Sequence, residues 1–231
     1  DDGMLPRVDA VIFDEAHKLP EIATNYFGSE LSTTAIREVV ESMRPILMGK
    51  FKSAAPKGTS WDVITQTIKK SLYDFVLGLE GAGVLEGDSR NIETISGMQG
   101  STQHLENAAL VLEVLLEAAA PFVEMSDDLG VFIESGTAIL QDMKQWVIWL
   151  KHAGMPMPPE QKPLVRWISR SRSEARLTVT PLDIAEPFSR MMNLRKETAW
   201  VFTSATMAVG DGEFKHFTQA LGIEGAEEHA W

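Results

Sequence analysis

The chain has 231 residues, of which 44% are hydrophobic and 23% charged, a balance typical of a globular protein with a hydrophobic core. Its 33 acidic and 21 basic residues give a formal net charge of −12, which argues against nucleic-acid binding through overall charge but leaves a local basic patch open. It has no cysteine, which excludes disulfides, thiolate metal sites, iron–sulfur ligation and cysteine nucleophiles within these residues. No stretch approaches the roughly 18 apolar residues of a membrane span, and the start lacks the features of a secretory signal. We therefore expect a cytoplasmic protein without membrane contact.

The first half of the chain predicts one strand followed by helices. The apolar run 8–13 (Val-Asp-Ala-Val-Ile-Phe) is rich in β-branched residues and predicts a buried strand of a parallel sheet. After a helix cap at Ser32-Thr33-Thr34, the pattern is mostly helical as far as Gly154. Four helices are predicted, at 34–48, 61–79, 104–125 and 131–152. The polar and glycine-rich segment 81–101 is long for a loop, so it is either mobile or holds unrecognised structure.

The periodicity changes after the proline-rich segment 155–163. Alternating segments at 164–169 and 175–180 flank Ser-Arg-Ser-Arg-Ser-Glu and predict a β-hairpin. A short helix at 184–194, a strand at 199–202 and a final helix at 213–221 are predicted after it. The expected fold class is mixed α and β, dominated by helices, with a few strands from both chain ends. These strands are too few for a nucleotide-binding domain, so we expect a piece of something larger.

The strongest candidate for chemistry is Asp14-Glu15-Ala16-His17, at the carboxyl end of the first predicted strand. Hydrolysis of a nucleoside triphosphate needs an acidic group to hold magnesium and a second group to position the attacking water. Adjacent carboxylates at a strand end meet this need, because active sites collect where the chain leaves a sheet. The alternative is a solvated acidic turn that opens a helix.

A second apolar strand also ends in small hydroxyl residues, at Thr203-Ser204-Ala205-Thr206. Alone, this pattern is more often an ordinary helix cap, but together the two motifs resemble motifs II and III of superfamily 2 helicases, the DEAH box and the Ser-Ala-Thr motif. The segments around them, 11–23, 177–185, 202–207 and 216–223, are similar to the XPD/DinG group and its YoaA-like branch. The matching segments cover about the first 30 and the last 65 residues, whereas the helical middle matches in position and character only.

The resemblance implies an architecture. In these helicases a helical arch interrupts the first RecA-like motor domain between motifs II and III. Residues 1–30 and 162–231 would then belong to that motor domain, and residues 31–161 would form the arch. The phosphate-cradling Gly-x-x-x-x-Gly-Lys-Ser/Thr loop is absent from the sequence, and the second motor domain would follow residue 231. The fragment alone should therefore not hydrolyse ATP, and the cysteine-bound 4Fe-4S cluster of the family would lie before motif II.

The resemblance also implies roles for individual residues and for cofactors in the full-length protein. Asp14 would hold Mg²⁺, Glu15 would orient and deprotonate the attacking water, and His17 would link the nucleotide site to neighbouring motor motifs. Thr203, Ser204 and Thr206 lie in motif III, which would couple hydrolysis to DNA movement. ATP would be the nucleotide and single-stranded DNA the partner, with 5′-to-3′ translocation in repair or replication. Met207 stands where the family has leucine, which is a conservative change.

Charge is unevenly distributed along the chain. Proteins hold single-stranded DNA by phosphate contacts and base stacking, which basic residues near an aromatic side chain can provide. Such a group surrounds one tryptophan and is a candidate site for single-stranded DNA. Its members are Arg166, Trp167, Arg170, Arg172 and Arg176, with Lys162 nearby in the sequence. The alternative is a solvated hairpin tip with the tryptophan in the core. A second basic group, between Arg37 and Lys70, is better explained as a solvated helix face.

Residues 101–160, by contrast, hold nine acids and two bases, which would repel a phosphate backbone. The second functional hypothesis follows from this charge: the acidic arch docks a repair or replication protein, and the motor strands serve only as its base. A third possibility is an unrelated helical protein with two accidental tetrapeptides. Salt-dependent DNA affinity that falls when Arg170 and Arg172 become alanine would favour a DNA-gating arch over protein docking.

Overall fold

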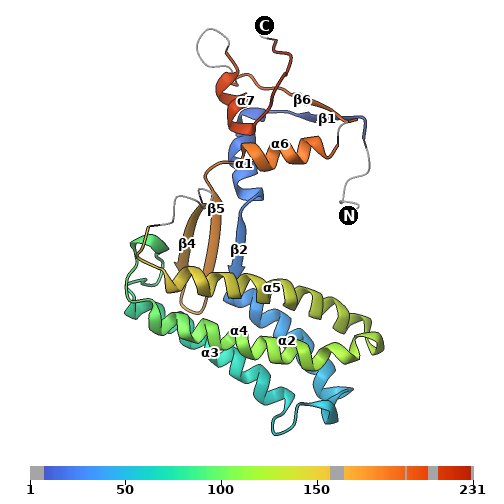
Figure 1. The fold of residues 1–231 in the computed structure, drawn as a ribbon, viewed down its shortest axis with the longest axis vertical. Coiled ribbons are helices and arrows are strands. Elements are labelled where there is room, and N and C mark those ends of the chain that lie inside the picture. The colour runs from blue at the N-terminus through green and yellow to red at the C-terminus, as the bar shows by residue number, and fades with distance from the viewer. Residues whose placement is uncertain (1–7, 157–163, 196, 208–212, 230–231) are drawn as a thin grey trace. The chain divides into compact units, whose positions relative to one another are not determined.

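The computed structural model describes residues 8–156, 164–195, 197–207 and 213–229. The chain forms two compact units, which we describe separately (Figure 1). The terminal unit comprises residues 1–29, 160–165 and 180–231, and the helical unit comprises residues 30–159 and 166–179. Helices dominate and strands are few, so the mixed, helix-dominated fold class predicted from the sequence is confirmed.

The terminal unit contains the two strands that precede the candidate motifs. Strand β1 (Ala10–Phe13) pairs in parallel with β6 (Ala199–Phe202), with Phe13 opposite Phe202. The two strands were predicted, the first of them as part of a parallel sheet, whereas their pairing with each other was not; the burial predicted for the first strand is wrong. Side chains alternate across a strand, so Phe13 and Phe202 pack against the helices while Ile12 on the other face is 68% exposed.

Three helices cover the packed face of this small sheet. They are α1 (Leu19–Tyr26), α6 (Ala185–Asn193) and α7 (Lys215–Leu221), and a single 3-10 turn, η1 (Ala16–Lys18), connects β1 to α1. Their buried core consists of Ala16, Leu19, Ala23, Ile184, Phe188, Phe217 and Leu221. The ring of Phe202 lies 5.5 Å from that of Phe13 and 5.7 Å from that of Phe217. This aromatic cluster fixes the ends of both strands, where the candidate motifs begin.

The helical unit is built from four long helices, α2 (Thr33–Gly49), α3 (Trp61–Gly81), α4 (Gln99–Ala119) and α5 (Asp127–Lys151). All four were predicted, although α4 begins earlier than expected and gives way to 3-10 turns, η4 (Ala120–Met125), at its end. The helix α2 packs against α3 and α5, and α4 packs against the same two helices. Each helix therefore has two neighbours, as in a four-helix bundle.

Caps and small residues define this packing. The N–H of Ala35 donates to Ser32 Oγ at 3.0 Å, which confirms the predicted cap of α2. A Cβ atom on Gly136 of α5 would lie 2.7 Å from Leu116 of α4, and one on Gly78 of α3 would lie 2.7 Å from Ser101 Oγ. Glycine at these positions thus allows close approach of α4 to both neighbours.

A four-stranded sheet has the order β2-β5-β4-β3. Strands β4 (Leu164–Arg170) and β5 (Ala175–Pro181) form the predicted hairpin, and β2 (Ser29–Ser32) lies beside β5. The strand β3 (Ser89–Asn91) is antiparallel to β4 and is followed by the turn η3 (Ile92–Thr94). The segment 81–101 therefore holds structure that its polar sequence did not reveal. Among the described helices, none is both long and apolar enough to cross a membrane.

Candidate functional site

The two candidate motifs lie side by side at one edge of the β1–β6 sheet. Because the strands are parallel and in register, both carboxyl ends meet at the same edge. Hydrogen bonds continue the pairing beyond the strands: the N–H of Thr203 donates to Phe13 O at 2.9 Å, and the N–H of Ala16 donates to Thr203 O at 2.9 Å. Residues nearly 190 positions apart in the sequence thus form one site.

Asp14 is positioned by the other motif. The hydroxyl of Thr203 donates to Asp14 Oδ1 at 3.0 Å, and the N–H of Glu15 donates to the same oxygen at 2.9 Å. These bonds fix the carboxylate, whereas its Oδ2 accepts no hydrogen bond from the described residues. A carboxylate held by one oxygen and open at the other suits a Mg²⁺ ion, which takes oxygen ligands and commonly retains several waters.

Glu15 has the left-handed backbone conformation, with φ 52° and ψ 40°, and no other described non-glycine residue has positive φ. This conformation costs about 1–2 kcal/mol in a residue with a Cβ atom. Burial of the next residue offsets this cost, because Ala16 is 1% exposed and packs in the core that contains Leu19 and Phe217. The result is a sharp turn that leaves the Glu15 side chain 59% exposed beside Asp14. Strain of this kind accumulates at functional sites.

His17 joins the two motifs through its ring nitrogen. Its Nδ1 lies 2.9 Å from Ser204 Oγ and 3.2 Å from Glu15 Oε2. The same Ser204 oxygen accepts the backbone N–H of Thr206 at 3.2 Å. The network therefore connects the acidic turn to the loop after β6, and the structure brings all six predicted motif residues together.

The predicted DNA-contacting residues do not share one surface. Arg166 and Arg170 of β4 face the helices and are 5% and 7% exposed. Arg166 donates to Glu93 Oε1 at 3.1 Å and lies 5.5 Å from the ring centre of Trp149. Arg170 donates to Glu80 at 3.0 Å and to the backbone oxygen of Val84 at 3.1 Å. Both arginines anchor the hairpin to the helices of this unit, a role that the spacing of basic residues could not reveal.

The other three members are exposed. Trp167 lies on the opposite face of β4 from the two buried arginines and is 38% exposed. The alternative explanation, in which this tryptophan lies in the core, is therefore wrong. Arg176 pairs with Glu30 at 3.0 Å and with Glu174 at 3.5 Å, and Arg172 lies exposed in the hairpin turn. Lys162 lies outside the described residues.

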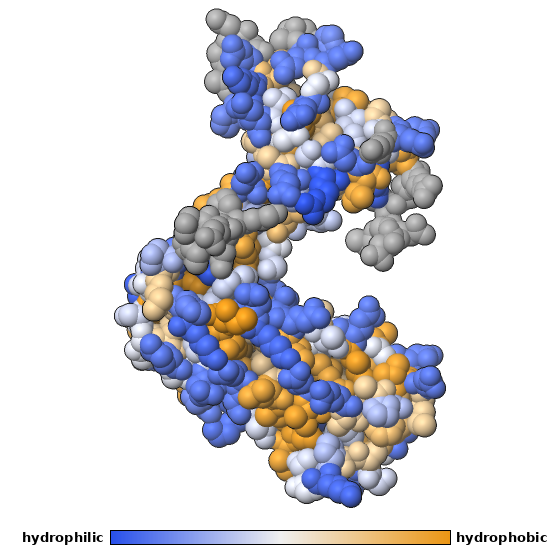
Figure 2. Space-filling model, viewed as in Figure 1, coloured by the Kyte–Doolittle hydropathy of each residue, from blue (hydrophilic) through white to orange (hydrophobic). Residues whose placement is uncertain are grey.

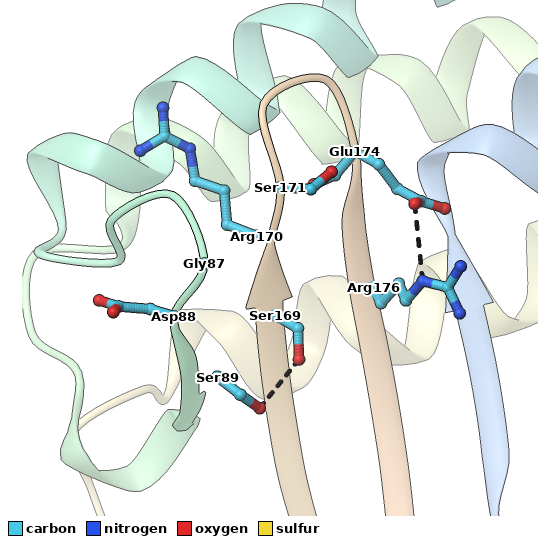
Figure 3. Close-up of a pocket in the computed structure, with 8 residues that line it drawn as sticks. All are labelled: Gly87, Asp88, Ser89, Ser169, Arg170, Ser171, Glu174 and Arg176. Carbon is cyan, nitrogen blue, oxygen red and sulfur yellow. Dashed lines mark hydrogen bonds and ion pairs between the residues drawn. The ribbon is translucent and has the colours of Figure 1, made fainter.

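An open pocket of about 210 Å³ lies over the same strands (Figure 3). Its lining includes Ser89 and Ser169, whose hydroxyls are hydrogen-bonded at 2.9 Å, and the ion pair between Arg176 and Glu174. The side chain of Arg170, which also lines the pocket, extends toward the helices in the close-up. Because both arginines of the lining are paired with carboxylates, the pocket offers no unpaired arginine to a phosphate.

Three bases of the second basic group, Arg44, Lys69 and Lys70, form ion pairs on α2 and α3. Arg44 pairs with Asp62 at 2.6 Å, an interaction that raises the pKa of the guanidinium group. Lys69 pairs with Glu41 at 2.7 Å, and Lys70 pairs with Asp74 at 2.6 Å. The arrangement is that of a solvated helix face with compensated charge.

Comparison with known proteins extends the resemblance over the whole chain. No family model matches the chain. It aligns over 97% of its length with two proteins named ATP-dependent DNA helicase YoaA, at 29% identity over 225 residues for Haemophilus influenzae and at 30% over 224 residues for Escherichia coli. The alignment includes the helical middle, in which no sequence similarity had been recognised. The chain spans 32% of the length of each relative. The resemblance to YoaA-like helicases of the XPD/DinG group is thus confirmed along the chain.

Proposed function

We propose that the chain is the segment of an ATP-dependent DNA helicase that runs from motif II through the arch to motif III. The observation that carries this proposal is the hydrogen-bonded contact between residues 14–17 and 203–206 at one sheet edge. The relatives named ATP-dependent DNA helicase support the same assignment. In this proposal residues 1–30 and 162–231 belong to the first motor domain and residues 31–161 to the arch, although residues 166–179 of the hairpin pack within the helical unit.

The acidic turn supplies the carboxylates for ATP hydrolysis. Bound Mg²⁺ would neutralise charge that develops on the phosphates. Asp14 would hold this ion through Oδ2, since Thr203 and the N–H of Glu15 already orient its Oδ1. Glu15 projects from the strained turn and would orient the attacking water and accept its proton. The phosphate-cradling loop is not among the 231 residues, so this chain alone is not expected to hydrolyse ATP.

His17 and Ser204 would couple hydrolysis to DNA movement. Their contact connects the residue beside the water-positioning carboxylate to the loop after β6. A displacement of Glu15 would therefore change the hydrogen bonds of Ser204 and of the Thr206 N–H. Of the candidate DNA contacts, Trp167, Arg172 and Arg176 are exposed and stay in the proposal, whereas Arg166 and Arg170 support the hairpin.

The proposal is tested with the full-length polypeptide that contains this segment. We expect ATP hydrolysis stimulated by single-stranded DNA and ATP-dependent unwinding of a duplex with a 5′ single-stranded tail. A duplex with a 3′ tail is the matched control for direction. Absence of both activities in a folded protein that binds ATP would contradict the helicase assignment.

A further inference from the structure

The helical unit carries a strip of exposed apolar side chains on α4 and α5. Figure 2 shows hydrophobic surface gathered over this part of the unit. The members of the strip, which we call the outer strip, are Leu110 (55% exposed), Val114 (47%) and Ile148 (53%). Exposed apolar side chains that gather in this way mark interaction sites more often than single exposed residues do.

Two ion pairs place the central members of the outer strip. Lys144 pairs with Glu113 at 2.5 Å, and Lys151 pairs with Glu106 at 2.7 Å. These pairs align α4 with α5 in opposite directions, because the higher number on α5 meets the lower number on α4. Ile148 lies between the two lysines and Leu110 lies between the two glutamates, so both belong to the same stretch of the α4–α5 contact. Val114 follows Leu110 by one helical turn and shares its face.

The unpaired charge beside the outer strip is negative. Both lysines of α5 form these ion pairs, and α4 (Gln99–Ala119) contains no lysine or arginine. Six acids of the stretch from α4 to α5 form no ion pair within the described residues: Glu117, Glu124, Asp127, Asp128, Glu134 and Asp142. Glu117 lies one turn beyond Val114 and is exposed, so this unpaired negative charge borders the apolar side chains.

We propose that the outer strip docks an amphipathic helix of another protein, with an apolar stripe against Leu110, Val114 and Ile148 and basic residues beside Glu117. A helix presents side chains at spacings of three and four, which matches an apolar surface formed by helix faces. Single-stranded DNA is disfavoured, because its phosphates would meet uncompensated carboxylates. A second copy of the chain is disfavoured for the same reason, since its own outer strip carries the same negative border. The surface goes beyond the proposed helicase activity, which uses the terminal unit.

A labelled model peptide tests the surface in this chain. The peptide carries leucine at every third or fourth position and lysine at the others, and its binding is followed by fluorescence anisotropy. We expect saturable binding that weakens as salt rises, and a loss of about tenfold in affinity for the double variant Leu110→Ser with Ile148→Ser. The matched control is Leu182→Ser with Leu194→Ser in the terminal unit, at positions 67% and 82% exposed, which should bind as the unchanged chain does.

A second variant leaves the apolar side chains in place. Glu117→Lys should weaken binding of the lysine peptide and strengthen binding of a peptide with glutamate in place of lysine. The proposal is overturned if the peptide does not bind, if a peptide of scrambled order binds equally well, or if neither variant changes the affinity. It is also overturned if a single-stranded oligonucleotide displaces the peptide, or if the outer strip instead mediates self-association that the double variant abolishes.

Discussion

At the residue scale, the site depends on a few precise contacts around one strained turn. Glu15 has a left-handed backbone, and its neighbour Ala16 is buried in the aromatic core that holds the turn. His17 lies within hydrogen-bonding distance of both Glu15 and Ser204. The motif residues themselves were predictable from the two tetrapeptides, but the strain and the pairing of Thr203 with Asp14 were not. Both depend on strand register, which no local pattern specifies.

Ser204→Ala tests the contact between the motifs in the full-length protein. The change removes the partner of His17 and the acceptor of the Thr206 N–H, while Asp14 and Glu15 stay in place. We expect DNA-stimulated ATP hydrolysis to fall by less than about tenfold and unwinding to fall by a larger factor. Measured in parallel, Ser189→Ala on α6, at a half-buried position whose hydroxyl accepts only a long hydrogen bond of 3.4 Å from Asn193, should change neither. Equal loss of both activities would contradict a coupling role.

At the element scale, periodicity predicted the long helices and the hairpin, because their apolar stripes and alternation extend over many residues. The strand β3 escaped recognition because it has three residues, all polar, and is paired along a strand far away in the sequence. The basic residues of β4 were wrongly grouped by proximity in sequence. A strand directs alternate side chains to opposite faces, so Arg166 and Arg170 are buried while Trp167 is exposed.

Arg170→Ala should destabilise the helical unit, whereas Arg172→Ala should not. Loss of Arg170 leaves the Val84 carbonyl without its donor and breaks the contact with Glu80, which we expect to cost about 1–3 kcal/mol of unfolding free energy. Arg172 is exposed in the turn, so its loss should change stability by less than about 0.5 kcal/mol. Urea unfolding followed by circular dichroism measures both values. Equal stability of the two variants would contradict the anchoring role of Arg170.

Two glycines with positive φ form a second matched pair. A Cβ atom on Gly154 would lie 2.8 Å from the carbonyl oxygen of Ile95, whereas one on Gly58 would meet nothing within 4 Å. Both alanine substitutions carry the left-handed strain of about 1–2 kcal/mol, and only Gly154→Ala adds a backbone clash. The difference in thermal unfolding midpoint between the Gly154→Ala and Gly58→Ala variants therefore measures the effect of the clash with Ile95. We expect Gly154→Ala to be the less stable variant by at least about 1 kcal/mol.

At the scale of the whole molecule, the chain combines a small terminal unit that carries the motifs with a larger helical unit. The resemblance recognised at the two ends was the strongest prediction, and the alignment with the two relatives over 97% of the chain confirms it. The first strand was predicted to be buried, and this prediction was wrong because the described residues form only a two-stranded sheet there, with helices on one face. Ile12 on the uncovered face is therefore exposed.

This organisation predicts how the chain behaves with nucleotide. The sequence supplies carboxylates for a metal ion but no glycine-rich loop with its lysine, and that loop provides most phosphate contacts. We expect titration of the 231-residue chain with ATP and Mg²⁺ to give no measurable heat in the micromolar range. A micromolar dissociation constant by calorimetry would mean that the chain holds a nucleotide site that the missing loop does not explain.

The central claim, that the turn after β1 is the water-activating element of an ATP-driven motor, is tested most directly by Glu15→Gln in the full-length protein. The amide keeps the size of the side chain but cannot accept a proton, so DNA-stimulated ATP hydrolysis should fall by about a hundredfold or more while ATP binding is retained. Glu21→Gln, an exposed position on α1, should leave the rate unchanged. Wild-type hydrolysis by the Glu15 variant would contradict the account.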